Sequence, residues 1–264
     1  GPVSWYEAHL CSEEGTNIIG ALFPGSPNIL IGANEYLGWA HTVNYPDKTD
    51  IFKLEMEDKK KGYYKFDNEV LKLNTYKAKL NYKLLGLFKI KIKKKFYKSI
   101  YGPTLKNKNR FYSVRTPSLF NIGGLEQWWR MGKSKTFTEF YNVLKSKQIP
   151  GYNIVYADRN DTIFYISNGL IPKRIEGFEW KEAVPGNTSK TLWNETYDID
   201  ELPQVIQPSS GYVYNANHSP FLSTDEQNNP DRNEFSDEIR SKALAFSGEV
   251  LMSHMLNFIL KSNG

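Results

Sequence analysis

Cys11 and His9 are the first residues of this chain whose types and spacing could do chemistry. A thiol becomes a nucleophile when a neighbouring imidazole lowers its pKa, and residues two positions apart on a strand share one face. Cys11 is the only cysteine, so this chain alone can form neither an internal disulfide nor a thiolate zinc cage. A lone cysteine at the end of an apolar strand is most often a small core residue, and we expect that role for Cys11.

The segment 23–52 is more informative, and reads FPGSPNILIGANEYLGWAHTVNYPDKTDIF. Its glycines and prolines mark positions where the chain turns sharply or lets another backbone come close. Its apolar runs, such as 29–31, are short enough for buried strands. The segment therefore predicts a loop-and-strand corner. Elsewhere the sequence contains no HExxH, P-loop, dinucleotide-binding or GxSxG motif.

Five blocks, in correct order along the chain, resemble the penicillin acylase family of N-terminal-nucleophile amidohydrolases, which includes penicillin, cephalosporin and acyl-homoserine lactone acylases. The blocks are SWYEAHL (4–10), GWAHT (38–42), YGPTL (101–105), NIVYADRNDTIFYISNGLIPKR (153–174) and SSGYVYNANHSP (209–220). Five ordered blocks are far more specific than one. The resemblance implies an α+β fold, the four-layer αββα sandwich of these hydrolases, present here in part as an internal fragment of the large subunit.

The resemblance also implies that the nucleophile is missing from these residues. Family members cut themselves to free a serine at the start of the large subunit, and its α-amino group serves as the base. The block that contains Ser4 resembles one that lies a short way after that serine, and the amine of Ser4 is tied up in a peptide bond. We therefore expect the isolated chain to be inactive. Its expected partners are the small subunit and the remainder of the large subunit, and a periplasmic or secreted location follows from the family.

Amide cleavage through a serine ester requires donors that meet the oxygen on which negative charge develops. The resemblance implies that these donors are the N–H of Val43 and the side-chain amide of Asn217, and that Arg240 orients the asparagine and the amino terminus. From the residues alone, Asn217 is equally well explained as a turn asparagine before Ser219-Pro220. Arg240 could also lie on the solvated side of an amphipathic helix.

The resemblance further places an apolar acyl pocket at Ile31, Trp128 and Tyr152, although each residue is equally plausible as plain core. No cofactor is required, but Asp47 and Asp50 match positions that bind a structural calcium ion in some relatives. Calcium takes roughly six to eight oxygen ligands. Two carboxylates on one loop are therefore a weak signal, and a solvated turn is the ordinary explanation.

Positioning such residues requires a scaffold rich in strands. The 264 residues are 40% hydrophobic and 14% aromatic, which indicates one ordered globular domain over residues 1–264. Strand patterns dominate residues 1–115, a helix begins after Thr136 as its N-cap, and a hairpin over 154–167 follows. Further helices are expected near Ser236 and from Gly248. No apolar run approaches the ~20 residues that cross a bilayer, so no membrane span is expected.

The charge is distributed unevenly along this domain. The net charge is +5, yet residues 53–110 alone contain 18 basic and 5 acidic residues, which predicts a lysine-rich β lobe. The alternation in 76–80 and 88–93 places lysines on one solvated sheet face, a common protection of sheet edges. Nucleic-acid binding would need arginines and exposed aromatics interleaved with the lysines, so we expect no nucleic-acid partner.

We therefore interpret the sequence as most of the large-subunit core of an acylase that hydrolyses the amide of an N-acylated small molecule. The alternative is a non-catalytic binding module. Such a module would be a degenerate acylase-like domain, or an aromatic-rich sheet protein that binds a glycan or a small molecule. A serine followed by Asn and Trp, encoded a short way upstream of Gly1, would favour the acylase.

Overall fold

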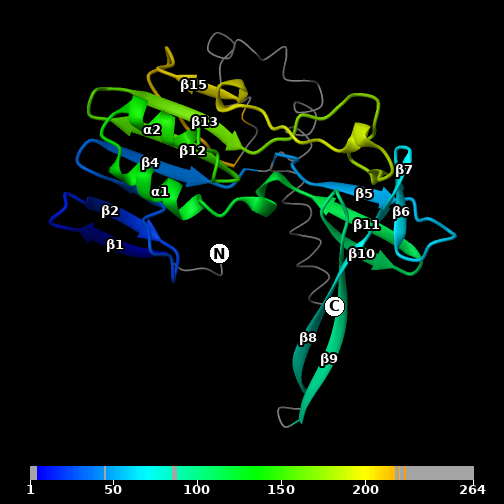
Figure 1. Ribbon diagram of the computed structural model, residues 1–264. Coiled ribbons are helices and arrows are strands. Elements are labelled where there is room, and N and C mark those ends of the chain that lie inside the picture. The colour runs from blue at the N-terminus through cyan, green and yellow to red at the C-terminus, as the bar shows by residue number, and fades with distance from the viewer. Residues whose placement is uncertain (1–4, 45, 85–87, 218–219, 221–222, 224–264) are drawn as a thin grey trace, which may run out of the picture. The chain divides into compact units, whose positions relative to one another are not determined.

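The computed structural model describes residues 5–44, 46–84, 88–217, 220 and 223, which pack into two compact units (Figure 1). Unit 1 comprises Gly1–Asp47, Phe120–Ile171 and Tyr197–Gly264, and unit 2 comprises Lys48–Leu119 and Pro172–Thr196. The predicted lysine-rich lobe at 53–110 belongs to unit 2, and the single domain over 1–264 stays a prediction. The helices predicted near Ser236 and from Gly248 lie outside the described residues.

Unit 1 is built on a seven-stranded antiparallel sheet with the order β1-β2-β3-β4-β12-β13-β15. β4 and β12 lie at its centre and pair from Leu37 with Asp158 to Thr42 with Asn153. The strands are β1 (Tyr6–Cys11), β2 (Asn17–Leu22), β3 (Ile31–Ala33), β4 (Leu37–Thr42), β12 (Gly151–Asp158), β13 (Ile163–Gly169) and β15 (Gln204–Ile206). The predicted hairpin over 154–167 is confirmed as β12 and β13, joined by the turn 158–162.

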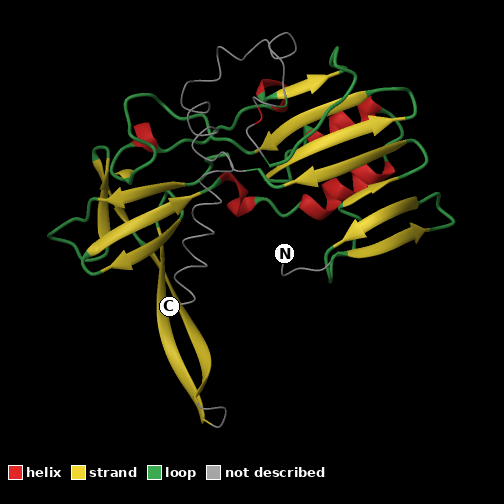
Figure 2. Ribbon diagram, turned by 180° about the vertical axis from the view of Figure 1, so that it is seen from behind, coloured by secondary structure: helices red, strands yellow, loops and turns green. Residues whose placement is uncertain are grey.

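Two helices, α1 (Gly124–Lys133) and α2 (Phe137–Leu144), pack on the same face of this sheet (Figure 2). α2 begins where the sequence predicted, because the Thr136 hydroxyl accepts a hydrogen bond of 3.2 Å from the N–H of Glu139. α1 was not predicted. Short 3₁₀ turns complete the elements at Pro117–Phe120, Ser189–Thr191 and Ile199–Glu201. In the part of the chain that the structure describes, no helix is long and apolar enough to cross a membrane.

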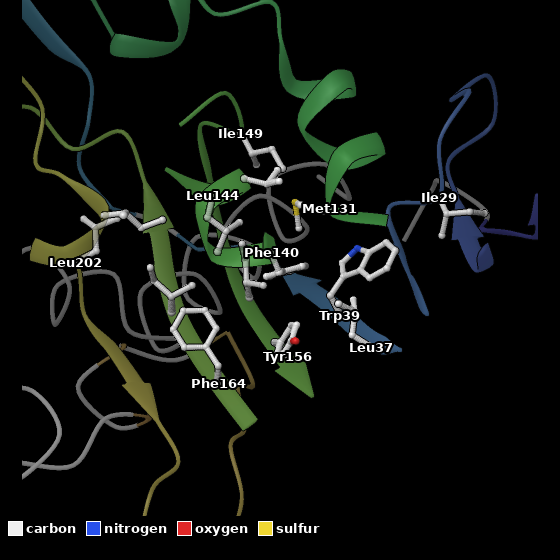
Figure 3. Close-up of a cluster of buried hydrophobic side chains, with 14 of the residues drawn as sticks. Ile29, Leu37, Trp39, Met131, Phe140, Leu144, Ile149, Tyr156, Phe164 and Leu202 are labelled. Carbon is white, nitrogen blue, oxygen red and sulfur yellow. The ribbon is translucent and has the colours of Figure 1, made fainter. Parts of the chain in front are cut away.

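The core of unit 1 fills the space between the two helices and the sheet (Figure 3). Trp39 of β4 and Tyr156 of β12 are cross-strand partners, and the ring of Phe140 from α2 lies 6.5 Å and 4.7 Å from their respective rings. Met131 of α1 and Leu144 of α2 are fully buried in the same cluster. These contacts fix one face of β4 and β12 against the helices.

Unit 2 contains a six-stranded sheet with the order β14-β5-β11-β10-β9-β8 and a separate hairpin, β6-β7. Its strands are β5 (Asp50–Leu54), β6 (Tyr63–Phe66), β7 (Glu69–Lys72), β8 (Asn74–Leu84), β9 (Phe88–Lys98), β10 (Pro103–Asn107), β11 (Arg110–Arg115) and β14 (Val184–Pro185). Phe52 and Tyr101 stack at 4.3 Å in its core. The next residue, Gly102, has φ +142°, and a Cβ there would lie 2.3 Å from the Val114 carbonyl oxygen, so only glycine fits.

One sequence expectation is wrong. Cys11 is exposed rather than a core residue, because it lies in β1 at the edge of the sheet, where β2 is its only partner among the described strands. Its sulfur lies 3.1 Å from His9 Nε2, which confirms that the two side chains share a face.

Candidate functional site

The block GWAHT forms β4 and directs its side chains alternately to the two faces of the sheet. Trp39 packs under the helices, so His41, two residues on, shares that face, whereas Thr42 faces the other side. β4 ends at Thr42, and Val43 and Asn44 begin the loop that follows. Asn44 donates its side-chain amide to the Asn168 carbonyl at 2.7 Å. The loop after β4 is thereby tied to the end of β13.

An asparagine cluster lies on the face of the sheet opposite the helices. The side-chain oxygen of Asn215 accepts three hydrogen bonds: from the Thr42 hydroxyl at 2.5 Å, from the Asn153 amide at 3.1 Å and from the backbone N–H of Asn217 at 2.8 Å. Asn153 is buried and accepts in turn from the Tyr165 hydroxyl at 2.9 Å. Asn215 therefore joins the ends of β4 and β12 to the segment that carries Asn217.

The structure brings together Asn217 and Val43, the two residues that the sequence analysis named as oxyanion donors. The amide nitrogen of Asn217 donates to the Val43 carbonyl at 2.7 Å, and that of Asn153 to the same carbonyl at 3.3 Å. Asn217 has φ +60°, a left-handed conformation that asparagine tolerates better than other side chains. Its side chain is exposed, and a side-chain amide carries two N–H donors. One is used on Val43, and the second makes no hydrogen bond to any of the described residues.

A hollow of about 530 Å³ adjoins this cluster on the face of the sheet away from the helices. Ala40 and Val155 are cross-strand partners in its floor, and Thr42 and Asn153 are the next pair on that face, two residues further along the strands. Two residues of strand span about 7 Å. An apolar surface and a group of amide donors thus lie within the length of a small acyl amide. The hollow is lined by Gly38, Trp39, Ala40, Val155, Tyr156, Ala157, Ile163, Gly211, Tyr212 and Val213.

Trp128 and Tyr152, predicted to line the acyl pocket, meet at His41 on the helix side of the sheet. The three rings lie 5.4–5.9 Å apart, and the Trp128 indole N–H donates to His41 Nε2 at 3.1 Å. Burial lowers the pKa of His41 to about 3, so the imidazole is neutral at neutral pH. Because Nε2 accepts, the proton is on Nδ1, which is buried and has no hydrogen-bond partner among the described residues.

Ile31, the third predicted pocket residue, lies apart from Trp128 and Tyr152. Its neighbour Gly32 pairs with Trp39, so Gly32 faces the helices and Ile31 faces the other side of the sheet. Ile31 is half-buried in β3. The structure thus brings two of the three predicted residues together on one face.

The two candidate calcium ligands have different surroundings. Asp47 belongs to unit 1 and Asp50 to unit 2. Asp50 is 1% exposed, and its Oδ2 accepts from Arg174 Nε at 2.9 Å and from the Trp193 indole N–H at 2.6 Å. A carboxylate that is already paired with a guanidinium is a poor ligand for a second cation. The described residues include no group of three or more His, Cys, Asp or Glu that could hold a metal ion, and the calcium site stays a prediction.

Sequence reasoning named some of these residues and missed others. Arg240 lies outside the described residues. Asn215, Thr42, Asn153 and His41 were not named, although each lies within two residues of a named position. A search for amides and hydroxyls flanking Asn217 and Val43 would have found the first two.

Comparison with known proteins gives consistent matches. A family model described as penicillin amidase matches residues 1–256. An acyl-homoserine lactone acylase PvdQ of Pseudomonas fluorescens (strain Pf0-1) is 26% identical over 253 residues, which cover 86% of this chain and 32% of the relative. Penicillin G acylase of Escherichia coli is 26% identical over 194 residues, or 74% of this chain and 23% of that protein. The chain thus spans about a third or less of the length of these relatives.

The solved structures include a match to the fold. A thermostable penicillin G acylase from Alcaligenes faecalis superposes with a TM-score of 0.74 and 21% sequence identity, covering 92% of this chain and 45% of the other. The predicted α+β fold of these hydrolases is confirmed, and this chain forms part of it. Within the described residues, unit 1 supplies one sheet and the helices that cover one of its faces.

Proposed function

Because this chain belongs to the penicillin amidase family, we propose that the protein it contributes to is an acylase that hydrolyses the amide bond of an N-acylated small molecule. One observation carries this proposal. The Asn217 and Asn153 amides lie beside an apolar hollow of about 530 Å³ on the same face of β4 and β12. The hollow can bury a hydrophobic acyl group, and the amides can donate hydrogen bonds to the carbonyl oxygen next to that group.

The proposed chemistry is acyl transfer through a serine. The hydroxyl of an N-terminal serine attacks the carbonyl carbon of the substrate, and the free α-amino group of that serine takes its proton. The resulting tetrahedral oxyanion accepts hydrogen bonds from the Val43 N–H and from the second N–H of the Asn217 amide. The proton then passes to the leaving amine, and water hydrolyses the acyl-serine by the same steps. No residue from Gly1 to Gly264 is a serine with a free α-amino group, so we propose that this chain alone has no turnover.

The hydrogen bonds around Asn215 support the role of Asn217. Donors aimed at a developing charge are effective when they need no reorganisation as the reaction proceeds. Asn215 holds the backbone of Asn217 at 2.8 Å, and the Val43 carbonyl holds its side chain at 2.7 Å. Asn215 is itself held by Thr42 and Asn153. The second N–H of Asn217, which has no partner among the described residues, is thereby directed before any substrate arrives.

His41 is unsuitable as the base of this reaction. A general base works best when its pKa is near the pH of operation, whereas burial lowers the pKa of His41 to about 3. The proposal therefore assigns proton transfer to the serine α-amine. His41, Trp128 and Tyr152 form an aromatic cluster on the far side of β4 and β12.

To test the proposal, the whole polypeptide that contains these residues is expressed and allowed to undergo self-cleavage. The processed protein is then assayed with a panel of phenylacetyl and straight-chain acyl p-nitroanilides and acyl-homoserine lactones. We expect hydrolysis of at least one acyl amide, and none by the isolated 264 residues. Asn160→Ala, in the exposed turn after β12, is the control variant and should keep full activity. Binding of acyl amides without turnover by the processed protein would instead indicate the binding module.

A further inference from the structure

The hairpin formed by β8 and β9 extends well beyond the sheet of unit 2. The two strands pair over their whole length, from Asn74 with Lys98 to Leu84 with Phe88. Among the described strands, β9 pairs with the rest of the sheet only at its base, where Tyr97 pairs with Thr104 and Lys98 with Pro103. The remainder is a two-stranded ribbon that projects from unit 2 (Figure 1). Eleven residues of strand are about 37 Å long.

The two faces of this ribbon differ in chemistry. Side chains directly opposite each other in an antiparallel pair share a face. Lys77 pairs with Lys95, Lys79 with Lys93, and Asn81 with Lys91, which defines a lysine face. The intervening pairs, Tyr76 with Phe96, Ala78 with Lys94, Leu80 with Ile92 and Tyr82 with Ile90, define a face that is apolar except for Lys94. Residues 74–98 include nine lysines and no acidic residue.

Each face carries an unfavourable feature. The six apolar side chains are between 43% and 56% exposed and share one face of the ribbon, interrupted at the Ala78–Lys94 pair, so they are not scattered singly over the surface. The lysine pairs place like charges directly opposite each other, and such pairs destabilise a hairpin. A two-stranded ribbon without a third strand or a helix is at best marginally stable by itself. A surface that buries the apolar face and also neutralises the lysines would remove both penalties.

Two simpler explanations account for only one face each. Lysines protect sheet edges from aggregation, but edge protection leaves the apolar face unexplained. Single-stranded nucleic acid binds where cations and stacking aromatics share one groove. Here Tyr76, Tyr82 and Phe96 lie on the face opposite the lysine pairs. Among the described residues 76–83 and 90–96, Lys94 is the only lysine that lies on the apolar face. Its ammonium lies 5.8 Å from the centroid of the Phe96 ring.

We propose that the β8–β9 hairpin docks on the surface of an anionic lipid bilayer. Amphipathic elements with apolar and aromatic side chains on one face and lysines on the other lie in the plane of the bilayer interface. The six apolar side chains enter the boundary between headgroups and acyl chains. The lysine face then lies at the level of the lipid phosphates, and the long lysine stems extend to them. This inference concerns unit 2 only and is independent of the proposed acylase activity.

Vesicle co-sedimentation tests the charge requirement. The 264-residue chain is mixed with vesicles of phosphatidylcholine alone or with 30% phosphatidylglycerol, at low and at physiological salt. Each lysine near an anionic surface contributes roughly fivefold to binding, so the triple variant Lys79→Gln, Lys91→Gln, Lys93→Gln should bind about a hundredfold more weakly. The matched control removes the same charge from the loop before β6: Lys59→Gln, Lys60→Gln, Lys61→Gln. It should bind within a few-fold of the unaltered chain.

A fluorescent label tests which face enters the bilayer. In a Cys11→Ser background, Tyr82→Cys on the apolar face and Asn81→Cys on the lysine face are each labelled with NBD. Vesicles with phosphatidylglycerol should shift the emission at position 82 to the blue, and leave position 81 near its value in water.

The outcomes that overturn the proposal are specific. They are no binding to anionic vesicles, equal loss of binding in the hairpin and loop variants, or equal emission shifts at positions 81 and 82. A blue-shifted emission at position 82 without vesicles would mean that protein, from this chain or a second copy, covers the apolar face. Tighter binding to a single-stranded oligonucleotide than to vesicles would indicate a nucleic-acid surface instead.

Discussion

Replacing Asp50 by asparagine should lower the stability of unit 2 far more than the substitution of any exposed charged residue. Asp50 accepts from Arg174 Nε at 2.9 Å and from the Trp193 indole at 2.6 Å. The side chains of Asp50 and Arg174 are only 1% and 4% exposed. An asparagine has nearly the same shape and retains one acceptor oxygen, so the substitution removes the negative charge and leaves the positive charge buried.

The burial of the pair sets the expected magnitude. Breaking a buried ion pair at one partner costs about 3–5 kcal/mol, because the remaining charge is left uncompensated. With a urea m-value of about 2 kcal/mol/M, the unfolding midpoint should fall by roughly 1.5–2.5 M. The control is Glu55→Gln, whose partner Lys65 lies at 2.6 Å but is 48% exposed. An exposed pair contributes only about 0–1 kcal/mol.

Urea unfolding followed by circular dichroism, with and without millimolar calcium, measures both effects. We expect a large loss for Asp50→Asn and a small one for Glu55→Gln. Equal and small losses would refute the account of the Asp50–Arg174 pair. If calcium raised the midpoint of the unaltered chain but not that of Asp50→Asn, Asp50 would be a calcium ligand, as the family resemblance suggests, and its pairing with Arg174 would be secondary.

Two further predictions concern unit 1. Burial lowers the pKa of His41 to about 3, so below its ordinary value of 6.5 the unfolded chain takes up a proton that the folded chain does not. The free energy of unfolding should therefore be highest above pH 6.5 and fall by up to about 1.4 kcal/mol per pH unit as the pH decreases toward 3. In urea titrations at pH 7, 6 and 5, His41→Gln should reduce this dependence on pH. An unchanged dependence would show that His41 does not cause it. Thr136→Ala should lower the free energy of unfolding by about 1 kcal/mol, because the hydrogen bond from the Glu139 N–H is lost, whereas Thr136→Ser should retain most of that stability. Equal melting temperatures for the two variants would contradict this capping role.

The sequence predicted α2 but not α1, and the difference is physical. α2 has a side-chain cap at Thr136 and an apolar stripe, both of which are local signals. α1 begins after Gly123 without a side-chain cap, and its buried positions include Gln127 and Gly132 rather than apolar residues only. Gln127 is accommodated in the core because its Oε1 accepts from the N–H groups of Gln148 and Ile149. That compensation is tertiary, so no local pattern reveals it.

The candidate site shows the same difference between features with a local sequence signal and features that arise from tertiary contacts. The family resemblance named Asn217 and Val43, and the structure places them in contact. The hub that holds them, Asn215, accepts from Thr42, which is 173 positions away in the chain. The register of β4 with β12 places Thr42 beside Asn153, so that both donate to Asn215, and no spacing in the sequence shows this. The exposed position of Cys11 has a similar origin, because only the sheet order shows that β1 is an edge strand.

The most direct test of the proposed acylase activity is the turnover number of Asn217→Ala and Asn217→Gly in the processed full-length protein. Both variants remove the same amide, so kcat for an acyl amide should fall by ~10²–10³ in each, with KM little changed. Their stabilities should differ, because alanine at φ +60° is strained by about 1 kcal/mol where glycine is not. If turnover stays within a few-fold of the unaltered enzyme while the melting temperature falls, Asn217 is a structural turn residue and the oxyanion assignment is wrong.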